Sequence, residues 1–288
     1  MKRRNLTSYI LVLVVLGTIA PKLKATIYFD DGKTHDITWP IGEKVHVLDS
    51  SLSEPTTVNL LQGASIGYDL DVFDNSVVNM SSTARIEQSL RAHDYSCVNI
   101  TYGSIGRDIF VNGNSQVSML DGGVAGQINS NYDGTLTIYG GFIRTFLFAG
   151  GNSQLYFSGG TIGDNLQANS DSKVFMSGGL VGDDLLAEMN SRVNLSGGTI
   201  GGRLIAQHTA ALTIEGFGFQ IDGQNVGYGV YTHEDYSNGR LTGLLTSNNI
   251  LNNDFVIADD ATIILIPEPS TLLLLILGGL AVRRKSQE

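Results

Sequence analysis

A repeat of about 19 residues runs through the middle of this chain. Three successive stretches begin with the same Ser-Gly-Gly triplet, at Ser158, Ser177 and Ser196, and are therefore evenly spaced. Related units begin near Ala64, Ala84, Gly103, Gly123, Gly141, Gly160, Gly179 and Gly198. Self-similarity at such a period is typical of solenoids, in which each unit buries its apolar residues by stacking on its neighbours.

Five columns of apolar or small residues recur in register with the repeat. The first column is Ile66, Ile86, Ile105, Ala125, Ile143, Ile162, Val181 and Ile200. The second is Leu70, Leu90, Ile109, Ile128, Leu147, Leu166, Leu185 and Leu204, and a third of smaller residues follows two positions later. The fourth and fifth, from Val78 and Met80 onward, are also two positions apart, which is the side-chain period of a β-strand.

The pattern predicts an all-β fold, a parallel β-helix (β-solenoid) of about eight coils over residues 57–216. Residues 26–56 and 217–266 are predicted to be β caps, because the open end of a solenoid is an exposed sheet edge. Asp31-Gly32 is the sequence of a hairpin turn within the first cap.

Two kinds of corner are predicted. Asn-Ser or Asp-Ser pairs recur just before the fourth column, where Asn tolerates a left-handed backbone and Ser bonds locally to the backbone. Glycine pairs at 122–123, 140–141, 159–160, 178–179 and 197–198 mark a second corner, where a Cβ would clash or φ is positive.

The two ends of the chain have the composition of targeting segments. A basic start and an apolar run from Tyr9 to Ala20 predict a signal peptide over residues 1–25, cleaved after Ala25 or Ala20; the alternative is a retained N-terminal anchor. Residues 267–288 contain a Pro-Glu-Pro triplet, an apolar stretch too short to span a bilayer well, and a basic cluster. The prolines predict an extended, accessible strip around this triplet. The alternative for this end is an ordinary C-terminal anchor.

The C-terminal segment resembles the PEP-CTERM sorting signal of Gram-negative bacteria, in Pro267, Glu268, Pro269, Arg283 and Arg284. The resemblance implies that signal peptidase and then an exosortase process the chain, with transient anchoring in the inner membrane. It also implies a destination at the cell surface or in the extracellular exopolysaccharide (biofilm) matrix.

The sequence contains little that points to catalysis or cofactors. The five histidines share no ligand spacing, so a structural or surface role is expected for each, and Cys97 is expected to face outward. Asp164 and Asp183 occupy equivalent positions in adjacent coils, and stacked carboxylates about 4.8 Å apart could share a calcium ion. The alternative is a solvated acidic face.

Charge and repeat together favour a non-catalytic role. The net charge is −10, and the chain without its two terminal segments is more acidic still, which argues against nucleic acid as a partner. We therefore expect no enzyme but a secreted or cell-surface structural or adhesion protein, associated with exopolysaccharide. The alternative is a polysaccharide lyase or hydrolase of the β-helix type, although the strict period leaves no insertions to form a groove.

Overall fold

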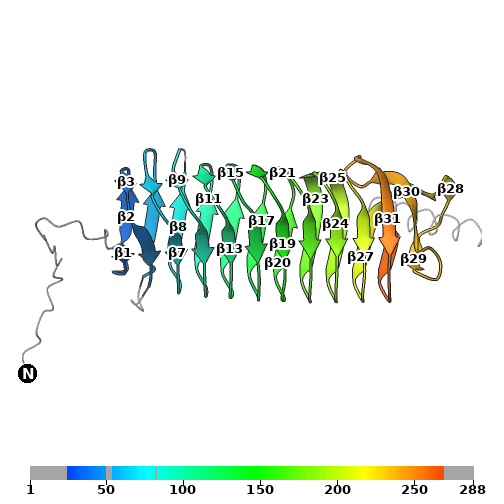
Figure 1. Ribbon diagram of the computed structural model, residues 1–288, viewed down its shortest axis with the longest axis horizontal. Helices are drawn as coiled ribbons and strands as arrows, with labels where there is room; N and C mark the ends of the chain where they lie inside the picture. The colour runs from blue at the N-terminus through cyan, green and yellow to red at the C-terminus, as the bar shows by residue number, and fades with distance from the viewer. Residues whose placement is uncertain (1–24, 50–53, 82, 269–288) are drawn as a thin grey trace, which may run out of the picture.

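The computed structural model describes residues 25–49, 54–81 and 83–268, and they form a rod (Figure 1). Their strands wind into a parallel β-solenoid of about 10 coils of roughly 19 residues. Every regular element of these residues is a β-strand. The predicted fold class is confirmed, and the coils outnumber the predicted eight because strands within residues 26–47 and 250–267 add to the solenoid.

Each coil places one strand on each of three faces, numbered in chain order. Strands of one face pair in parallel with the equivalent strands of the neighbouring coils. Face 1 consists of β1 (Thr26–Phe29), β4 (Lys44–Val47), β7 (Leu70–Val72), β10 (Leu90–Ala92), β13 (Ile109–Val111), β16 (Ile128–Ser130), β19 (Leu147–Ala149), β22 (Leu166–Ala168), β24 (Leu185–Ala187), β26 (Leu204–Ala206) and β31 (Ile250–Ile257).

Faces 2 and 3 follow the same rule. Face 2 consists of β2 (Thr34–Ile37), β5 (Thr57–Leu60), β8 (Val77–Met80), β11 (Cys97–Ile100), β14 (Gln116–Met119), β17 (Thr135–Ile138), β20 (Gln154–Phe157), β23 (Lys173–Val181), β25 (Arg192–Ile200), β27 (Ala211–Ile221) and β32 (Thr262–Pro267). Face 3 consists of β3 (Pro40–Ile41), β6 (Ser65–Ile66), β9 (Arg85–Ile86), β12 (Ser104–Ile105), β15 (Gly123–Val124), β18 (Phe142–Ile143), β21 (Thr161–Ile162) and the last residues of β23 and β25.

The five apolar columns line the interior, with one correction. The second to fifth columns are buried throughout, as predicted. In the first column the inward residue of β15 is Val124, which pairs with Ile105 and Ile143, whereas Ala125 is exposed. The unit therefore begins at Gly122 and not at Gly123. With this start, the units from Gly103 onward are evenly spaced, whereas a start at Gly123 makes one interval longer and the next shorter.

The region predicted as the N-terminal cap is a coil of the solenoid. Strand β1 pairs in parallel with β4, and β2 pairs in parallel with β5. The predicted hairpin at Asp31-Gly32 is therefore wrong: Gly32, at φ 65°, turns the chain from face 1 to face 2. More residues separate β4 of face 1 from β5 of face 2 than in the later coils, so the interval from Val45 to its partner Leu70 exceeds the repeat length.

The chain after Gly216, predicted as the C-terminal cap, leaves the solenoid and then returns to it. The extended end of β27 pairs antiparallel with β30 (Asn238–Leu245), which pairs antiparallel with β31. β31 and β32 then stack in parallel on β26 and β27. Antiparallel pairs thus follow Gly216 within the predicted cap, but the rod does not end there. Two short strands, β28 (Gln224–Asn225) and β29 (Gly229–Thr232), complete this end, to the right in Figure 1.

The corner between faces 1 and 2 has a buried serine in most coils. Ser76, Ser115 and Ser153 donate their hydroxyl hydrogens to backbone carbonyls of the preceding coil. The left-handed residue is not the predicted Asn but the one before it, as at Asp74 (φ 54°) and Met189 (φ 56°). The predicted local bonding is seen at Ser96, Ser172 and Ser191, whose hydroxyl oxygens accept from the backbone N–H three residues earlier. The role given to Asn is corrected.

The glycine corner between faces 2 and 3 is confirmed in most coils. Gly141, Gly160, Gly179 and Gly198 have φ between 83° and 95°. A Cβ on the preceding glycine of each pair would lie 2.2–2.6 Å from a backbone oxygen of the previous coil. The exception is Gly123, where φ is not positive and an added Cβ would meet nothing within 4 Å.

The terminal targeting segments are largely outside the described residues. These include residues 1–24 of the predicted signal peptide, and Pro269, Arg283 and Arg284 of the predicted sorting signal. Pro267 is the last residue of β32, where it pairs with Gly216, so the predicted accessible strip begins within the sheet. Among the residues described, no helix is long and apolar enough to cross a membrane.

Candidate functional site

The predicted calcium pair lies on the turn between faces 3 and 1. Asp164 and Asp183 are exposed and occupy equivalent positions in adjacent coils, where the Asp183 N–H donates to the Asp164 carbonyl at 3.1 Å. Within residues 25–49, 54–81 and 83–268, no three His, Cys, Asp or Glu side chains gather closely enough to hold a metal ion. The calcium site therefore stays a prediction that rests on two solvated carboxylates.

The acidic column beside this pair has a structural role. Asp69, Asp108, Asn165 and Asp184 each accept a hydrogen bond from the backbone N–H of a residue in the next coil. Asp184 also lies 2.8 Å from the guanidinium of Arg203. Burial acts to raise the pKa of Asp184, but the Arg203 hydrogen bonds outweigh it and lower the pKa. These side chains hold the coils in register.

A dense group of titratable side chains, which the sequence analysis missed, lies on face 1 around Asp71. Its carboxylate lies 2.6 Å from Lys44 Nζ and 3.3 Å from Arg91, which also pairs with Asp69 at 2.9 Å. Although Asp71 points outward from the strand, it is only 4% exposed, because its partners cover it. In the sequence, Asp71 could have been noticed from its outward position between Leu70 of the second column and Val72 of the third.

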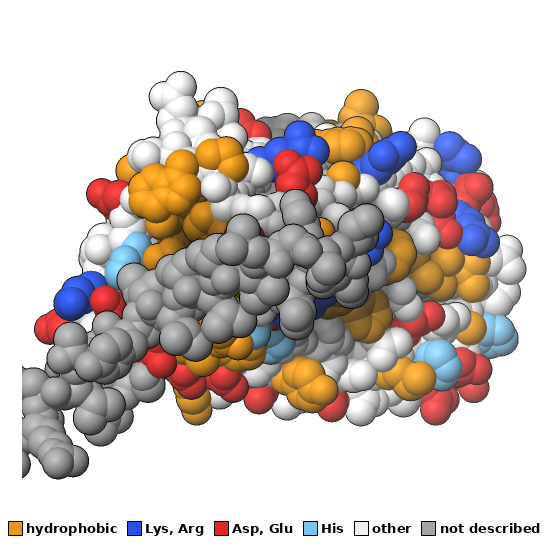
Figure 2. Space-filling model, turned by 60° about the vertical axis from the view of Figure 1, so that its left-hand side comes forward, with side chains coloured by type: hydrophobic (Ala, Val, Ile, Leu, Met, Phe, Trp, Pro, Cys, Tyr) orange, Lys and Arg blue, Asp and Glu red, His pale blue; other side chains and the backbone are white. Residues whose placement is uncertain are grey.

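Histidines border the Asp71 group, in keeping with the predicted structural role. His93 stacks on Phe73, with ring centroids 4.7 Å apart and planes 8° from parallel. His46 Nε2 lies 3.1 Å from Asp71 but lacks the alignment of a hydrogen bond. Figure 2, which brings the N-terminal end of the rod forward, shows acidic, apolar and histidine side chains interspersed on this side of the molecule.

Acid is expected to weaken the fold through these histidines. Burial lowers the pKa of His46 and of His93 below the usual value of 6.5, although Asp71 acts in the opposite sense. The folded state thus binds fewer protons, so the stability from the neutral rings is complete above pH 6.5 and is lost as pH falls through the folded pKa. We expect the urea midpoint to fall between pH 7.5 and pH 5, and to fall less in His93→Phe, which keeps the stack. An equal fall in both proteins would contradict the assignment.

Cys97 faces outward from β11, as predicted, and is half-buried. Burial raises the pKa of its thiol, and a weak contact from Sγ to Asn99 at 3.9 Å opposes this shift. A raised pKa favours the unreactive thiol over the nucleophilic thiolate.

Face 2 begins as a ladder of amide side chains. Asn59 donates to Asp36 at 2.7 Å, Asn79 donates to Asn59 at 2.9 Å, and Asn99 donates to Asn79 at 2.9 Å. Farther along the same column, the rings of Tyr156 and Phe175 stack at 5.1 Å. Face 2 therefore presents a flat surface of hydrogen-bonding and aromatic groups, repeated at the strand spacing.

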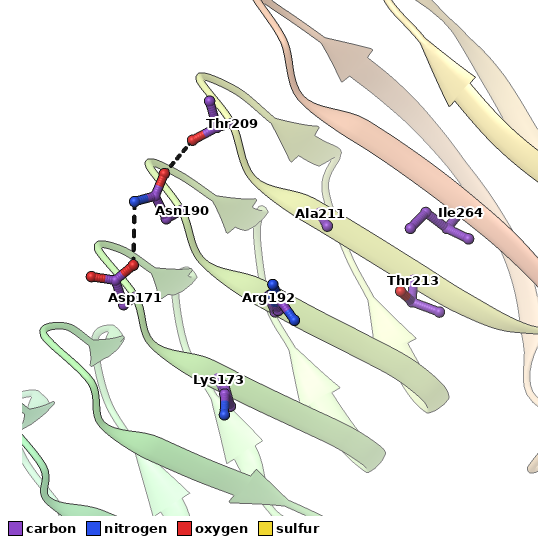
Figure 3. A pocket seen from close by; sticks show the side chains of 8 residues that line it. All are labelled: Asp171, Lys173, Asn190, Arg192, Thr209, Ala211, Thr213 and Ile264. Atoms are coloured by element: carbon purple, nitrogen blue, oxygen red, sulfur yellow. Dashed lines mark hydrogen bonds between the residues drawn. The ribbon is translucent and has the colours of Figure 1, made fainter.

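A hollow of about 770 Å³ opens on face 2 near the C-terminal end (Figure 3). Lys173 and Arg192 stand in register on β23 and β25, and the same column continues with the short Ala211. The hollow forms because Ala211 and Thr213 leave space between these cations and Ile264 of β32. We call it the face 2 hollow.

The rim of the face 2 hollow is a polar ladder along the corner. Asn190 donates its amide to Asp171 at 3.2 Å and accepts from the hydroxyl of Thr209, as the dashed lines in Figure 3 mark. In the described part of the chain, neither Lys173 nor Arg192 has an acidic partner within salt-bridge distance. Two neighbouring cations that lack salt-bridge partners could hold an anionic group, and the carboxylate, amide and hydroxyl groups of the rim could bond to a polyhydroxylated ligand.

Compared with protein-family models, with curated proteins and with solved structures, the chain gives no match in any of the three comparisons.

Proposed function

We propose that this protein is a non-catalytic, exported rod that binds a carboxylated exopolysaccharide at the cell surface or in the extracellular matrix. The observation that carries the proposal is the stacked pair Lys173 and Arg192 over the face 2 hollow. Most of this acidic protein repels an anionic polymer, so a cation pair without acidic partners among the described residues favours one place of attachment.

The geometry of the face 2 hollow suits one acidic sugar within a longer chain. Adjacent coils place equivalent residues about 4.8 Å apart, so both cations can reach one carboxylate. The Asp171–Asn190–Thr209 ladder offers donors and acceptors for hydroxyl groups. On the N-terminal side of the hollow, face 2 gives a long polymer a regular surface of hydrogen-bonding and aromatic groups to follow.

The alternative function, a polysaccharide lyase or hydrolase, needs an acid or base that reaches its substrate. The densest titratable group of the described residues is centred on Asp71, which is covered and paired with Lys44 and Arg91. This arrangement favours binding over catalysis.

The proposal includes the processing route that the two ends of the chain suggest. Signal peptidase removes the N-terminal segment, and an exosortase reads the segment from Pro267 onward after transient anchoring in the inner membrane. Because β32 ends at Pro267, the body remains intact only if the cut falls after this strand.

The test is a binding measurement with a short oligogalacturonate, for which a neutral dextran oligomer is the control ligand. The full chain should bind the acidic oligomer and not dextran, and binding should weaken as salt rises. Replacing both Lys173 and Arg192 with Ala should lower affinity at the face 2 hollow at least tenfold, since each charge-assisted contact contributes about 1.5–3 kcal/mol.

The matched control exchanges the two cations, as Lys173→Arg with Arg192→Lys, and should bind nearly as well. Lys33→Ala, a highly exposed cation at the other end of the rod, should not change binding. If the double Ala variant binds as tightly as the native chain, the face 2 hollow is not the attachment site. If the native chain binds no acidic glycan, the proposed function is wrong.

A further inference from the structure

Face 3 has a second hollow, of about 400 Å³, which we call the face 3 hollow. Its floor is formed by small residues of two neighbouring coils, among them Ser104, Gly123 and Ala125. Arg85 lies on one side of this floor, and Phe142 and Arg144 lie on the other.

The floor exists because of a glycine that the fold does not need. Gly123 occupies the outward column of face 3, where the neighbouring coils have Ser104 and Phe142. Its φ is not positive, and an added Cβ would meet no atom within 4 Å. Most glycines of the glycine corner, by contrast, are required by φ or by close contact with the previous coil. Neither backbone strain nor packing therefore requires a glycine at position 123. Its effect is to leave the floor of the hollow open.

The walls of the face 3 hollow combine an apolar surface with a free cation. Phe142 is 49% exposed, so much of its ring is open to a ligand on the floor of the hollow. Arg144 has no acidic partner within salt-bridge distance in the part of the chain that the structure describes, whereas Arg85 pairs with Glu87 at 2.8 Å. A flat ring beside an unpaired guanidinium suits a ligand with an apolar face and a carboxylate at its edge.

We propose that the face 3 hollow is a second glycan site, which binds a carboxylated pyranose with its ring on Phe142 and its carboxylate on Arg144. Together with the face 2 hollow, it lets one rod hold two polysaccharide chains and crosslink them. The proposal rests on the proposed function, because it assumes the same class of ligand. The two hollows are on different faces and their centres are about five coils apart, roughly 24 Å along the axis, so one chain does not block the other.

The experiment is calorimetric titration of the full chain with the short oligogalacturonate. The native protein should bind two oligomers per chain. Gly123→Leu should fill the face 3 hollow and reduce the count to one, without loss of stability, because Leu180 occupies the same column in a later coil. Arg144→Ala should weaken the same site about tenfold.

Two controls separate the sites. Thr199→Leu, an exposed position of the same column far from the hollow, should leave both sites intact. The variant with Ala at Lys173 and Arg192 should lose the other site and keep this one. Mixed with long polygalacturonate, the native rod should raise the viscosity of the solution, and either single-site variant should not.

The outcomes distinguish the two proposals. If Gly123→Leu and Arg144→Ala leave the stoichiometry and viscosity unchanged while the Lys173 and Arg192 variant abolishes binding, the second site is wrong and the proposed function stands. If Gly123→Leu alters binding only by unfolding the protein, seen as a lowered melting temperature, and Arg144→Ala has no effect, the second site is also wrong. If the native chain binds no oligomer, both proposals fail.

Discussion

Leu166→Asp is expected to unfold the central coils of the rod. Leu166 is fully buried and stacks between Leu147 and Leu185 of the adjacent coils. Losing the leucine alone costs about 2–5 kcal/mol, and an unpaired carboxyl group adds a further desolvation cost of a few kcal/mol. A domain is stable by only about 5–15 kcal/mol in total, so this one change removes much of the margin. Circular dichroism melts and urea titrations measure the loss.

The control for this substitution is the preceding residue. Asn165→Asp keeps the oxygen that accepts the hydrogen bond of the Asp184 N–H, so its cost should stay within about 1 kcal/mol. Equal tolerance of both substitutions would mean that the inward column has been assigned to the wrong residue.

Removing β32 is expected to have the second large effect. A chain that ends at Ala258 loses Ile263 and Leu265, which are 3% and 1% exposed, and leaves β27 paired in parallel with β25 alone. Burial of two such side chains contributes about 3–6 kcal/mol, before the lost hydrogen bonds are counted. The truncated protein should melt well below the full chain and should expose β27 to aggregation.

The matched truncation ends at Glu268 and keeps the whole of β32. Its melting temperature should equal that of the full chain. If the chain that ends at Ala258 is as stable as the one that ends at Glu268, then β32 is not part of the cooperative unit, and the rod ends near Gly216 as the sequence alone indicates.

The interior of the rod could be predicted because each inward residue repeats under the same constraint. The second column, from Leu70 to Leu204, accepts only residues that stack on their neighbours, so its period is visible without any alignment. The error at Ala125 arose because two adjacent small apolar residues, Val124 and Ala125, both fit a column with one-residue adjustments. Strand pairing resolves the choice in favour of Val124.

The ends of the rod were harder to predict because their connections break the period. Val45 stacks on Leu70, and Leu204 stacks on Phe255, after a much longer excursion of the chain. Neither interval is a multiple of the repeat length, so the first and last coils were interpreted as caps. The left-handed corner position was missed for another reason: Asp74, Tyr132 and Met189 occupy it, and they share no side-chain chemistry.

The two hollows could not be predicted from sequence because missing side chains form them. Ala211 and Gly123 each stand in an outward column, where residues of every kind occur and no pattern is required. Only the positions of their neighbours in space show that the gaps at Ala211 and Gly123 adjoin the unpaired cations Arg192 and Arg144. The Asp71 group was missed because its side chains, too, stand in an outward column, and only the stacking of coils brings Lys44 and Arg91 to Asp71.

The orientation of the ladders determines how the rod responds to force. Hydrogen bonds between coils run along the rod axis, so tension applied at its two ends loads them lengthwise and opens them one coil after another. Each coil that opens releases about 65 Å of extended chain, in place of a rise of about 4.8 Å. A pulled rod therefore lengthens in discrete steps at a modest, repeated force and dissipates mechanical work at each step, while the coils not yet reached keep their shape.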